Sequence, residues 1–554
     1  MLKKNSPVIT SSGVQENEYV DFKDVFGNER LSEFEPFRYY EFPQELRHQL
    51  NKSQSHISMG LFSTISRAWM SVDGDLFFWK FDTNSDLAYF DSIKDTITHV
   101  QLVHPKRQYT DSKIHFIVVV ITNDTPIQNV IGTQEGRIFV AGQDSLYELN
   151  YQTGTWLRGP KCNKYNHTKN YISTFIPAIS FLSAVEEIRL IAVDDTRHIL
   201  YTLGDKSTIQ VFDLGSDGLS LARKKFCSLL DIQKEIRSCC GVEDDFLASI
   251  VTINAIPSTR SQYACLEAVT SKGMRIYFSV YPTAFTPNYP IEQSDARPTT
   301  FRVIHIRYPP NEIYGLNRGV YVYCTQRENE SFILGHMIDE NETSMTAFSS
   351  STFQYISSFI ESFAVFPFDG SVWAIALLPE STSTSSTPSN IVPIIDTPWV
   401  VRQHAELTQK LYILSSEGVY IFQKISPLEI FRRLLSLYDC DSRQFLRYSD
   451  FHGPLEICVM ALTILATNLA DNVQVENSAV RVLMEFGGSP IVTISHDGGS
   501  SFYSPTNNQS IANLSALQAT PLRSSTPQNY QSNDENSATN CCKFMEYKNM
   551  FSSK

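Results

Sequence analysis

The sequence predicts a mainly β fold, a β-propeller that is followed by the start of an α-helical region. Short apolar runs separated by turn residues recur from Ile65 to Lys424, with no long helical periodicity among them. The 554 residues include 35 Phe and 26 Tyr, and aromatic side chains favour strands. About 360 residues, at roughly 45 to 50 per blade, allow seven or eight blades. After Lys424 the apolar residues change to helical spacing.

The stretch from Met59 to Asp91 shows the strand pattern most clearly. It holds three apolar runs, Ile65–Val72, Leu76–Phe81 and Leu87–Phe90. Asp73-Gly74-Asp75 separates the first two runs and is a tight-turn signal, so we expect a β-hairpin there. Because the second run is apolar on both faces for most of its length, we expect a strand that is buried on both sides.

Pairs of apolar runs around a polar or glycine-containing turn recur along the chain. We expect hairpins around Gly142–Ser145 and around Ser271-Lys272-Gly273, and further strands at Leu190–Val193, His198–Thr202, Thr208–Leu214, Val372–Leu378, Leu411–Leu414 and Val419–Gln423. Such turns before aromatic-rich strands are typical of the inner hairpins of propeller blades. The Trp-Asp and Gly-His signatures of the commonest propeller repeat are absent, so the predicted propeller is a divergent one.

The chain divides into four predicted segments. We expect a loosely ordered N-terminus at 1–40, the propeller at 41–425, the first helices of an α-solenoid at 426–488, and a disordered tail rich in Ser, Thr, Asn and Pro at 489–554. A short helix is expected at Phe42–Leu50, where the propeller begins. Two segments interrupt the strand pattern, Leu221–Ile250 and the exposed Ser/Thr/Pro loop Pro379–Pro398.

Ser426-Pro427-Leu428-Glu429 marks the start of the helical region. It combines an N-cap serine, a proline at the first helical position and a glutamate at the third, which together form a capping box. We expect two more helices, at Leu455–Leu469 and at about Val475–Phe486. The apolar faces of these helices would need further helices to cover them.

The composition argues against several classes of protein. The formal net charge is −13, which disfavours a general nucleic-acid binder, since phosphate contacts need clustered Lys and Arg. The N-terminal residues MLKKNSPVITSSG lack the apolar core of a signal peptide, and the apolar runs fall short of the roughly 20 residues that span a bilayer. Ten cysteines without regular spacing favour reduced thiols. We expect a soluble protein of the cytosol or nucleus.

No catalytic motif stands out, and we expect no enzyme, no cofactor and no metal site. There is no Gly-x-Ser-x-Gly elbow, no phosphate-binding Gly-rich loop and no His-Glu-x-x-His pair. His104, His305 and His496 have no second catalytic side chain at a motif spacing in the sequence. We interpret them as surface or core residues. Asp194-Asp195 is interpreted as a turn or a solvated pair, because adjacent residues on a strand point to opposite faces.

A set of strings, taken in order, resembles a known family. The strings are Met59-Gly-Leu-Phe-x-x-Ile-Ser-Arg-Ala-Trp69, Asp73, Asp75, Trp79, Asp86-Leu-Ala-Tyr-Phe-Asp91, Gly136-Arg-Ile-Phe, Leu146-Tyr-Glu, Arg197, Ile199-Leu-Tyr-Thr202 and Ile209-Gln-Val-Phe-Asp-Leu-Gly215. Through them, most of residues 40–490 resembles the N-terminal part of the nucleoporin 155/170 family, the large scaffold proteins of the inner ring of the nuclear pore. The resemblance implies a seven-bladed propeller followed by a long α-solenoid.

The resemblance also implies a function. We expect a structural constituent of the nuclear pore complex at the nuclear envelope, which supports protein and mRNA transport and pore assembly. Its expected partners are other inner-ring nucleoporins, pore-membrane proteins and the nuclear-envelope membrane surface. Family members continue for many hundreds of residues beyond 489–540, so we expect that this chain is truncated. The alternative is a propeller adaptor without a pore or membrane role, and an enzyme that uses the propeller channel is a third hypothesis with no residues to nominate.

The interruption at 221–250 holds the candidate membrane-contact residues. The basic cluster Arg223, Lys224 and Lys225 precedes an apolar set made of Phe226, Leu229, Leu230 and Ile236. If the segment formed one helix, its apolar residues would share a broad face, and the cations would lie at the N-terminal end of the helix. This arrangement suits an anionic membrane surface. In the family that the chain resembles, a propeller loop at the corresponding place contacts membranes. The alternative is a solvated loop or a helix packed on the propeller.

The tail carries candidate phosphorylation sites. Ser489, Ser504, Thr520 and Thr526 each precede a proline, and added dianions there could loosen assembly contacts. Phe486-Gly487 is a single Phe-Gly pair, whereas a domain that binds transport receptors would need many. We therefore expect a scaffold without receptor-binding repeats.

Overall fold

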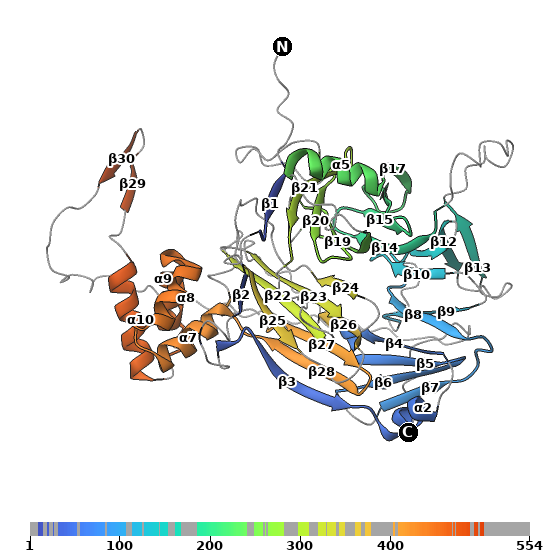
Figure 1. Cartoon of the computed structure of the whole chain (residues 1–554), viewed down its shortest axis with the longest axis horizontal. Coiled ribbons are helices and arrows are strands. Elements are labelled where there is room, and N and C mark those ends of the chain that lie inside the picture. The colour runs from blue at the N-terminus through green and yellow to red at the C-terminus, as the bar shows by residue number, and fades with distance from the viewer. Residues whose placement is uncertain are drawn as a thin grey trace, which may run out of the picture.

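The computed structural model describes residues 9–503 with internal gaps, and it shows a mainly β molecule in a propeller arrangement with helices beside it (Figure 1). The gaps of five or more residues are 107–113, 153–160, 168–185, 241–248, 282–296, 310–318, 349–360, 367–371 and 378–402, and the others are shorter. For residues 319–366 and 492–503 only the backbone is described. The predicted loop Pro379–Pro398 lies outside the described residues.

Four sheets are built from strands that follow one another along the chain. The first holds β4 (Ile57–Phe62), β5 (Arg67–Val72), β6 (Asp75–Lys80) and β7 (Asp86–Phe90), and the second holds β8 (Ile97–Val103) and β9 (Ile117–Thr122). The third holds β10 (Ile127–Gly132), β11 (Ile138–Gly142), β12 (Leu146–Gln152) and β13 (Lys161–Asn166). The fourth holds β14 (Ile188–Asp194), β15 (Ile199–Gly204), β16 (Ile209–Asp213) and β17 (Ala222–Cys227).

Three further sheets each include a strand from the N-terminal segment. The fifth contains β18 (Ile250–Ala255), β19 (Leu266–Thr270), β20 (Arg275–Ser279) and β21 (Arg302–Arg307), with β1 (Thr10–Ser12) parallel to β21. The sixth has the order β2 (Tyr19–Asp21), β25 (Glu361–Phe366), β22 (Gly319–Arg327), β23 (Glu330–Ile338) and β24 (Thr343–Phe348). The seventh holds β26 (Val372–Leu377), β27 (Lys410–Ser415), β28 (Gly418–Lys424) and β3 (Phe34–Glu41).

The sheets are arranged around a ring that the N-terminal segment helps to close. The strands β4, β8, β10, β14, β18, β24 and β26 contact one another in that order, and β26 contacts β4. β3 pairs antiparallel with β28, so chain that precedes the ring completes the last sheet. The prediction of a loosely ordered segment at 1–40 is therefore corrected for 10–12, 19–21 and 34–40, because backbone pairing with strands far away in the sequence orders these stretches.

The predicted hairpin at Asp73-Gly74 is present. Val72 pairs with Asp75, which leaves a two-residue turn, and Asp73 has a positive φ of 53°. β6 is buried on both faces, as expected, with Trp79 only 1% exposed. Gly60 faces Trp69 across β4 and β5, and a β-carbon at Gly60 would lie 2.5 Å from the indole nitrogen. The glycine therefore lets the Trp69 ring lie flat across the neighbouring strand.

The other predicted hairpins are also present. The turns 142–145 and 271–273 join β11 to β12 and β19 to β20, and the remaining predicted runs coincide with β14, β15, β16, β26, β27 and β28. The short predicted helix at Phe42–Leu50 is α2 (Gln44–Lys52), and a 3₁₀ turn, η3 (Ser63–Ile65), precedes β5. The segment 221–250, for which no strand was expected, contains β17 and the helix α5 (Leu229–Cys240).

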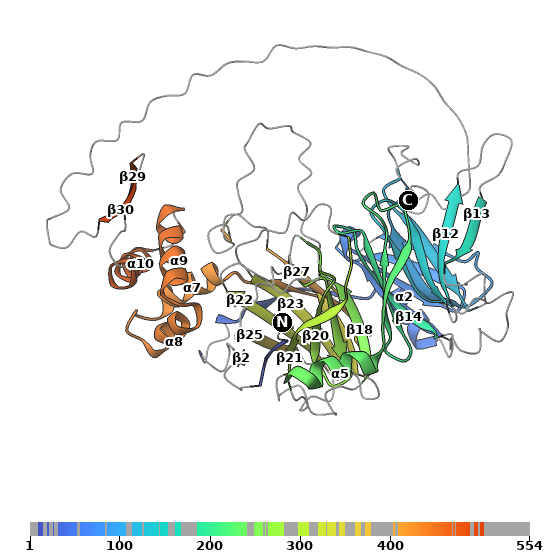
Figure 2. The same ribbon diagram turned by 90° about the horizontal axis from the view of Figure 1, so that it is seen from above.

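The helical region begins at the predicted cap. The Ser426 side chain accepts a hydrogen bond from the Glu429 amide (3.3 Å), and α7 (Pro427–Leu437) follows. α9 (Pro454–Ala466) and α10 (Val473–Phe486) match the other two predicted helices, whereas α8 (Arg443–His452) was not predicted. Ser442 caps α8 by accepting from the Phe445 amide. Figures 1 and 2 agree that these helices lie beside the propeller.

The predicted disordered tail is described only in part. Residues 492–503 form a two-stranded sheet from β29 (Val492–His496) and β30 (Gly499–Tyr503), which corrects the prediction for that stretch. Residues 504–554 lie outside the described residues, as do the candidate phosphorylation sites Ser489, Ser504, Thr520 and Thr526.

Candidate functional site

The candidate membrane-contact residues lie on two consecutive elements, β17 and α5. β17 pairs antiparallel with β16, and Phe226 lies opposite Gln210. Residues 223–226 therefore form part of an extended strand, which corrects the prediction that they begin a helix. The pairing shifts at Lys224, which has no partner on β16, so the strand carries a β-bulge there. Arg223 and Phe226 lie opposite Phe212 and Gln210 on one face of the sheet, and Lys225 lies opposite Val211 on the other.

α5 begins at a capping box that the sequence analysis missed. The Ser228 hydroxyl donates to Asp231 Oδ2 (2.7 Å) and also accepts from the Asp231 amide (3.3 Å). The Asp231 carboxylate accepts in turn from the Ser228 amide (3.1 Å), so two orphan donors at the helix start are satisfied. The Ser-x-x-Asp spacing at 228–231 was the local signal for this helix.

The inner side of α5 packs on the propeller. Ile232 and Ile236 are fully buried, and they belong to a core cluster that includes Ile9 and Ile306, with Leu229 packed against it. α5 contacts β1 and β21. The predicted apolar face is thus wrong for Ile236 and Leu229, because these side chains turn towards the sheet to bury their surface.

The outer side of the strand–helix junction exposes apolar and basic side chains. Phe226 is 58% exposed and Leu230, four residues later, is 64% exposed. Arg223, Lys224 and Lys225 are also exposed. We call Arg223, Lys224, Lys225, Phe226 and Leu230 the junction surface. Of the predicted set, these five residues are the ones that the structure leaves exposed.

One of the three cations is partly neutralised. Lys224 Nζ lies 3.5 Å from Asp213 Oδ2, and Asp213 also accepts from Arg297 Nε (2.9 Å). Burial alone would raise the pKa of Asp213, but the hydrogen bonds from Arg297 outweigh burial and lower it. Arg223 and Lys225 have no ion pair with a described residue. Within the described part of the chain, the junction surface therefore keeps two positive charges without an ion-paired carboxylate.

The histidines and the paired aspartates behave as structural residues where they are described. His305 is buried, its Nε2 lies 2.8 Å from Ser12 Oγ, and burial next to Arg307 and Arg275 lowers its pKa to about 3. The His104 ring packs 5.1 Å from the Phe116 ring, and only the backbone of His496 is described. Asp194-Asp195 was predicted to be a turn or a solvated pair, and a turn does begin at Asp195. Asp194 is not solvated, because it is buried and ion-paired with Arg197 (2.8 Å).

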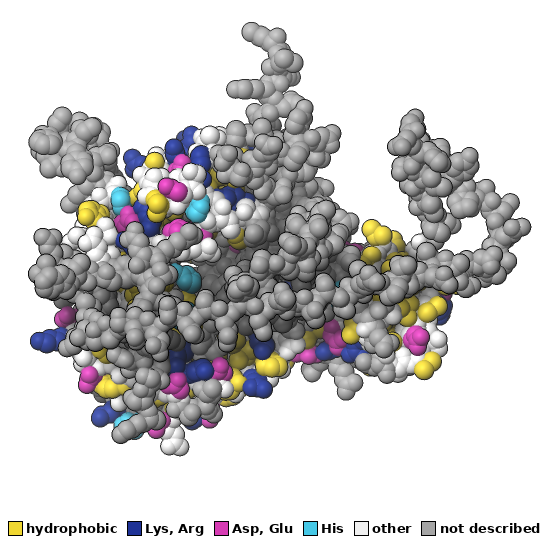
Figure 3. Space-filling model, turned by 180° about the vertical axis from the view of Figure 1, so that it is seen from behind, with side chains coloured by type: hydrophobic (Ala, Val, Ile, Leu, Met, Phe, Trp, Pro, Cys, Tyr) yellow, Lys and Arg dark blue, Asp and Glu magenta, His cyan; other side chains and the backbone are white. Residues whose placement is uncertain are grey.

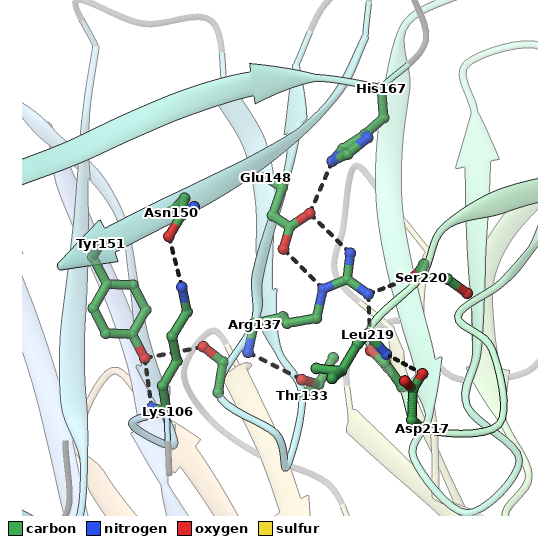
Figure 4. Close-up of polar contacts among 12 residues, drawn as sticks. Lys106, Thr133, Arg137, Glu148, Asn150, Tyr151, His167, Asp217, Leu219 and Ser220 are labelled. Carbon is green, nitrogen blue, oxygen red and sulfur yellow. Dashed lines mark hydrogen bonds and ion pairs between the residues drawn. The ribbon is translucent and has the colours of Figure 1, made fainter. Parts of the chain in front are cut away.

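Figure 4 shows a polar network that joins the third and fourth sheets. Arg137 donates to both oxygens of Glu148 (2.8 and 2.9 Å) and to the carbonyls of Gly218 and Ser220, in the loop between β16 and β17. His167 Nε2 lies 2.9 Å from Glu148 Oε2. Burial opposes ionisation of Glu148, but the hydrogen bonds from Arg137 and His167 outweigh it and lower the pKa to about 2.

Buried arginines recur near the start of the second strand of a sheet. Arg67, Arg137 and Arg197 are each less than 9% exposed and pair with Asp86, Glu148 and Asp194, respectively. Arg67 and Arg137 come directly before an apolar run and Arg197 comes two residues before one, which is the sequence signal that could have identified them. Because charged side chains are rarely buried unless paired, these three pairs are structural parts of the propeller.

The described residues offer no grouping of three or more His, Cys, Asp or Glu side chains that could hold a metal ion. Among the described helices, none is by itself long and apolar enough to cross a membrane. One bent pair, Arg443–His452 with Pro454–Ala466, passes that test by length and composition alone.

Comparison with known proteins identifies similar sequences. A model of a family described as Nup133 N terminal like matches residues 31–128 and 120–393. The chain is 23% identical to nuclear pore complex protein Nup154 of Drosophila melanogaster over 541 residues, which cover 87% of the chain and 39% of that protein. It is 26% identical to nucleoporin NUP170 of Chaetomium thermophilum over 335 residues, which cover 53% of the chain and 23% of that protein. The chain thus spans about a quarter to two fifths of these relatives' lengths.

A solved structure has a similar fold. The N-terminal domain of Chaetomium thermophilum Nup170, solved in complex with Nup53, superposes with a TM-score of 0.64 at 20% identity. The superposition covers 87% of this chain and 74% of that one. The likeness extends over most of the described residues, so it supports the propeller arrangement as a whole.

Proposed function

The chain belongs to the nucleoporin family described as Nup133 N terminal like, and from this we propose that it is a structural, non-enzymatic component of the nuclear pore complex. The observation that carries the proposal is the extent of the family match, which spans residues 31–393 and so includes most of the propeller. The similar proteins are themselves named as nucleoporins. Propellers with few functional side chains serve well as rigid scaffolds, because each blade packs on its neighbours.

The propeller in this proposal has seven blades. The support for this number is a closed ring of contacts among seven strands, β4, β8, β10, β14, β18, β24 and β26. Each of these strands belongs to a different sheet. The sheet of β8 and β9 is the short blade. The propeller then takes in the N-terminal strands from Thr10 and extends to 425, and the helices occupy 426–488.

The helices α7–α10 begin an α-solenoid in this proposal. Large apolar side chains remain exposed on α9 and α10, among them Leu455 (72%), Val473 (69%) and Met484 (77%). Figure 3 shows hydrophobic side chains on the surface of this helical part. Such a face suits the packing of a further helix pair, as in stacked helical repeats.

The proposed location is the nuclear pore at the nuclear envelope, and the proposed partners are other nucleoporins and pore-membrane proteins. The test is the position of the tagged full chain in cells, with the tag alone as control. A ring of signal at the nuclear rim that coincides with a pore marker is expected. A diffuse cytoplasmic signal, with proximity labelling that recovers no nucleoporin, would contradict the proposal and favour the adaptor without a pore role.

We further propose that the junction surface contacts the nuclear-envelope membrane. Phe226 and Leu230 are exposed apolar side chains four residues apart, and Arg223 and Lys225 lie beside them without a neutralising partner among the described residues. This combination suits insertion of two apolar side chains below anionic headgroups. Leu229 and Ile236 are no longer candidates for membrane contact, because they pack against the core of the propeller.

Liposome flotation tests the membrane contact. The full chain is mixed with vesicles that contain anionic lipid, and the double variant Phe226→Asp, Leu230→Asp is compared with it. Because both side chains are exposed, the variant keeps the fold, and loss of flotation is expected. The matched control is Leu455→Asp on α9, another exposed leucine, which should float as the unmodified chain does. Equal flotation of all three proteins would reject the contact.

A further inference from the structure

The sheet of β8 and β9 has the fewest strands of the seven propeller sheets in the described part of the chain. It is two-stranded, whereas the sheets on either side, which begin with β4 and β10, have four strands each. No described strand pairs with the outer edge of β9. The β9 sequence Ile-Val-Val-Val-Ile-Thr has no charge and no proline, the features by which proteins usually protect a free edge.

Neighbouring sheets provide apolar side chains next to this edge. Val118 and Val120 pack against the cluster that Ala88 and Phe90 of β7 also join. Ile117 and Val119, on the opposite face, pack against the cluster that Tyr147 and Leu149 of β12 join. β7 and β12 belong to four-stranded sheets, which extend further from the inner strands than the two-stranded sheet does. Their side chains therefore lie on either side of the space next to β9. A further strand beside β9 would therefore have apolar contacts on both of its faces.

The chain itself completes other sheets in this way. β1, β2 and β3 come from the N-terminal segment and add to the outer edges of β21, β25 and β28. Two of these additions are parallel and one is antiparallel. The outer edges in this propeller therefore accept strands that are distant in the sequence, through backbone hydrogen bonds.

Two lysines, Lys164 on β13 and Lys106 in the segment after β8, pack on tyrosines of β12 and bring positive charge there. The Lys164 ammonium lies 3.8 Å from the centre of the Tyr147 ring, and the Lys106 ammonium lies 4.9 Å from the centre of the Tyr151 ring. Lys164 pairs across the ladder with Leu149, so it lies on the face that packs towards β9. The acidic Glu148 is adjacent to Tyr147 on the strand and is paired with Arg137.

We propose that the outer edge of β9 binds an extended segment of a partner protein, which adds a third strand to this sheet. The segment alternates uncharged β-branched residues and carries an acidic residue that meets Lys164. The segment pairs with β9 through backbone hydrogen bonds to residues 117–121. The ion pair between Lys164 and the acidic residue makes the site prefer segments with an acidic end. This inference goes beyond the pore-scaffold role and does not rest on it.

A synthetic peptide tests the proposal. The probe is acetylated Asp-Thr-Val-Thr-Val-Thr-Asp, labelled for fluorescence anisotropy, and it is added to the full chain. Two control peptides have either lysines at both ends or a proline in place of the central threonine. We expect binding of the acidic peptide, weaker binding of the lysine peptide and no binding of the proline peptide, since proline lacks the amide that a strand must donate. Hydrogen exchange at residues 117–121 should slow when the acidic peptide binds.

Charge reversal tests the role of Lys164. An exposed ion pair contributes about 0.2–1 kcal/mol, so Lys164→Glu should weaken the acidic peptide by about two- to fivefold and favour the lysine peptide instead. The matched control is Lys225→Glu on β17, the outer strand of another sheet, which should change neither affinity. Both side chains are exposed, so both variants keep the fold.

Four results would overturn the proposal. The first is the absence of binding by the acidic peptide. The second is slowed exchange at another edge strand, such as β17, instead of at 117–121. The third is protection of 117–121 that rises with protein concentration in the absence of peptide, which would mean that a second copy occupies the edge. The fourth is protection that is complete without peptide at every concentration, which would mean that the chain covers its own edge.

Discussion

Replacement of Glu148 by glutamine should destabilise the propeller, because it removes the counter-charge of a buried guanidinium. Arg137 is 7% exposed and donates both of its fork nitrogens to Glu148. The Glu148 pKa of about 2, against an ordinary value of 4.5, corresponds to roughly 3 kcal/mol at 1.36 kcal/mol per pKa unit. The carboxylate keeps some contact with solvent, so screening reduces this to about 2 kcal/mol. For a propeller of roughly 380 residues, the expected fall in Tm is about 2–3 °C.

The sign of the pH dependence follows from the direction of the pKa shift. Because the pKa is lower in the folded state, the contribution of Glu148 is complete above about pH 4.5 and is lost as the pH falls towards 2. The difference between the unmodified chain and Glu148→Gln should therefore shrink by about a third to a half between pH 6 and pH 3.5. Thermal melts followed by circular dichroism at both pH values measure it.

The control for this prediction is Glu41→Gln. Glu41 pairs with Arg47 at 2.6 Å, but both side chains are well exposed, so the expected loss is below about 1 kcal/mol. The reasoning is refuted if Glu148→Gln melts at the temperature of the unmodified chain, or if its deficit stays constant from pH 6 to pH 3.5.

Five further substitutions test three separate parts of the structure by urea denaturation. Ile236→Ala should cost about 2–5 kcal/mol because Ile236 is fully buried, whereas Leu230→Ala on the exposed side of α5 should stay within about 0.5 kcal/mol; equal losses would contradict the orientation of the helix. Ser426→Ala should cost about 1 kcal/mol by removing the acceptor for the Glu429 amide, and Ser426→Asp should restore it. Gly60→Ala should cost about 1–3 kcal/mol, because its β-carbon would press on the Trp69 ring, and an unchanged midpoint would show that the ring can shift freely.

Local signals in the sequence predicted most of the strands and helices. The turn at Asp73-Gly74 and the cap at Ser426 act through residues within four positions of one another, so they can be recognised without the fold. The same kind of signal was present but overlooked at Ser228 and at Ser442. The resemblance to a nucleoporin family also came from the sequence, and the family comparison confirmed it.

Strand partners and buried faces were decided by the tertiary structure. β1 and β3 pair with β21 and β28, which lie about 290 and 380 residues away, and no local pattern specifies such a partner. The sequence of Arg223–Phe226 predicts the start of an amphipathic helix, but these residues form a strand because they pair with β16. Ile236 and Leu230 are equally apolar in the sequence, and only the position of β1 and β21 beneath α5 determines which of them is buried. The sequence determined where elements form, since that depends on neighbouring residues, whereas long-range contacts decided which surfaces remain available for partners.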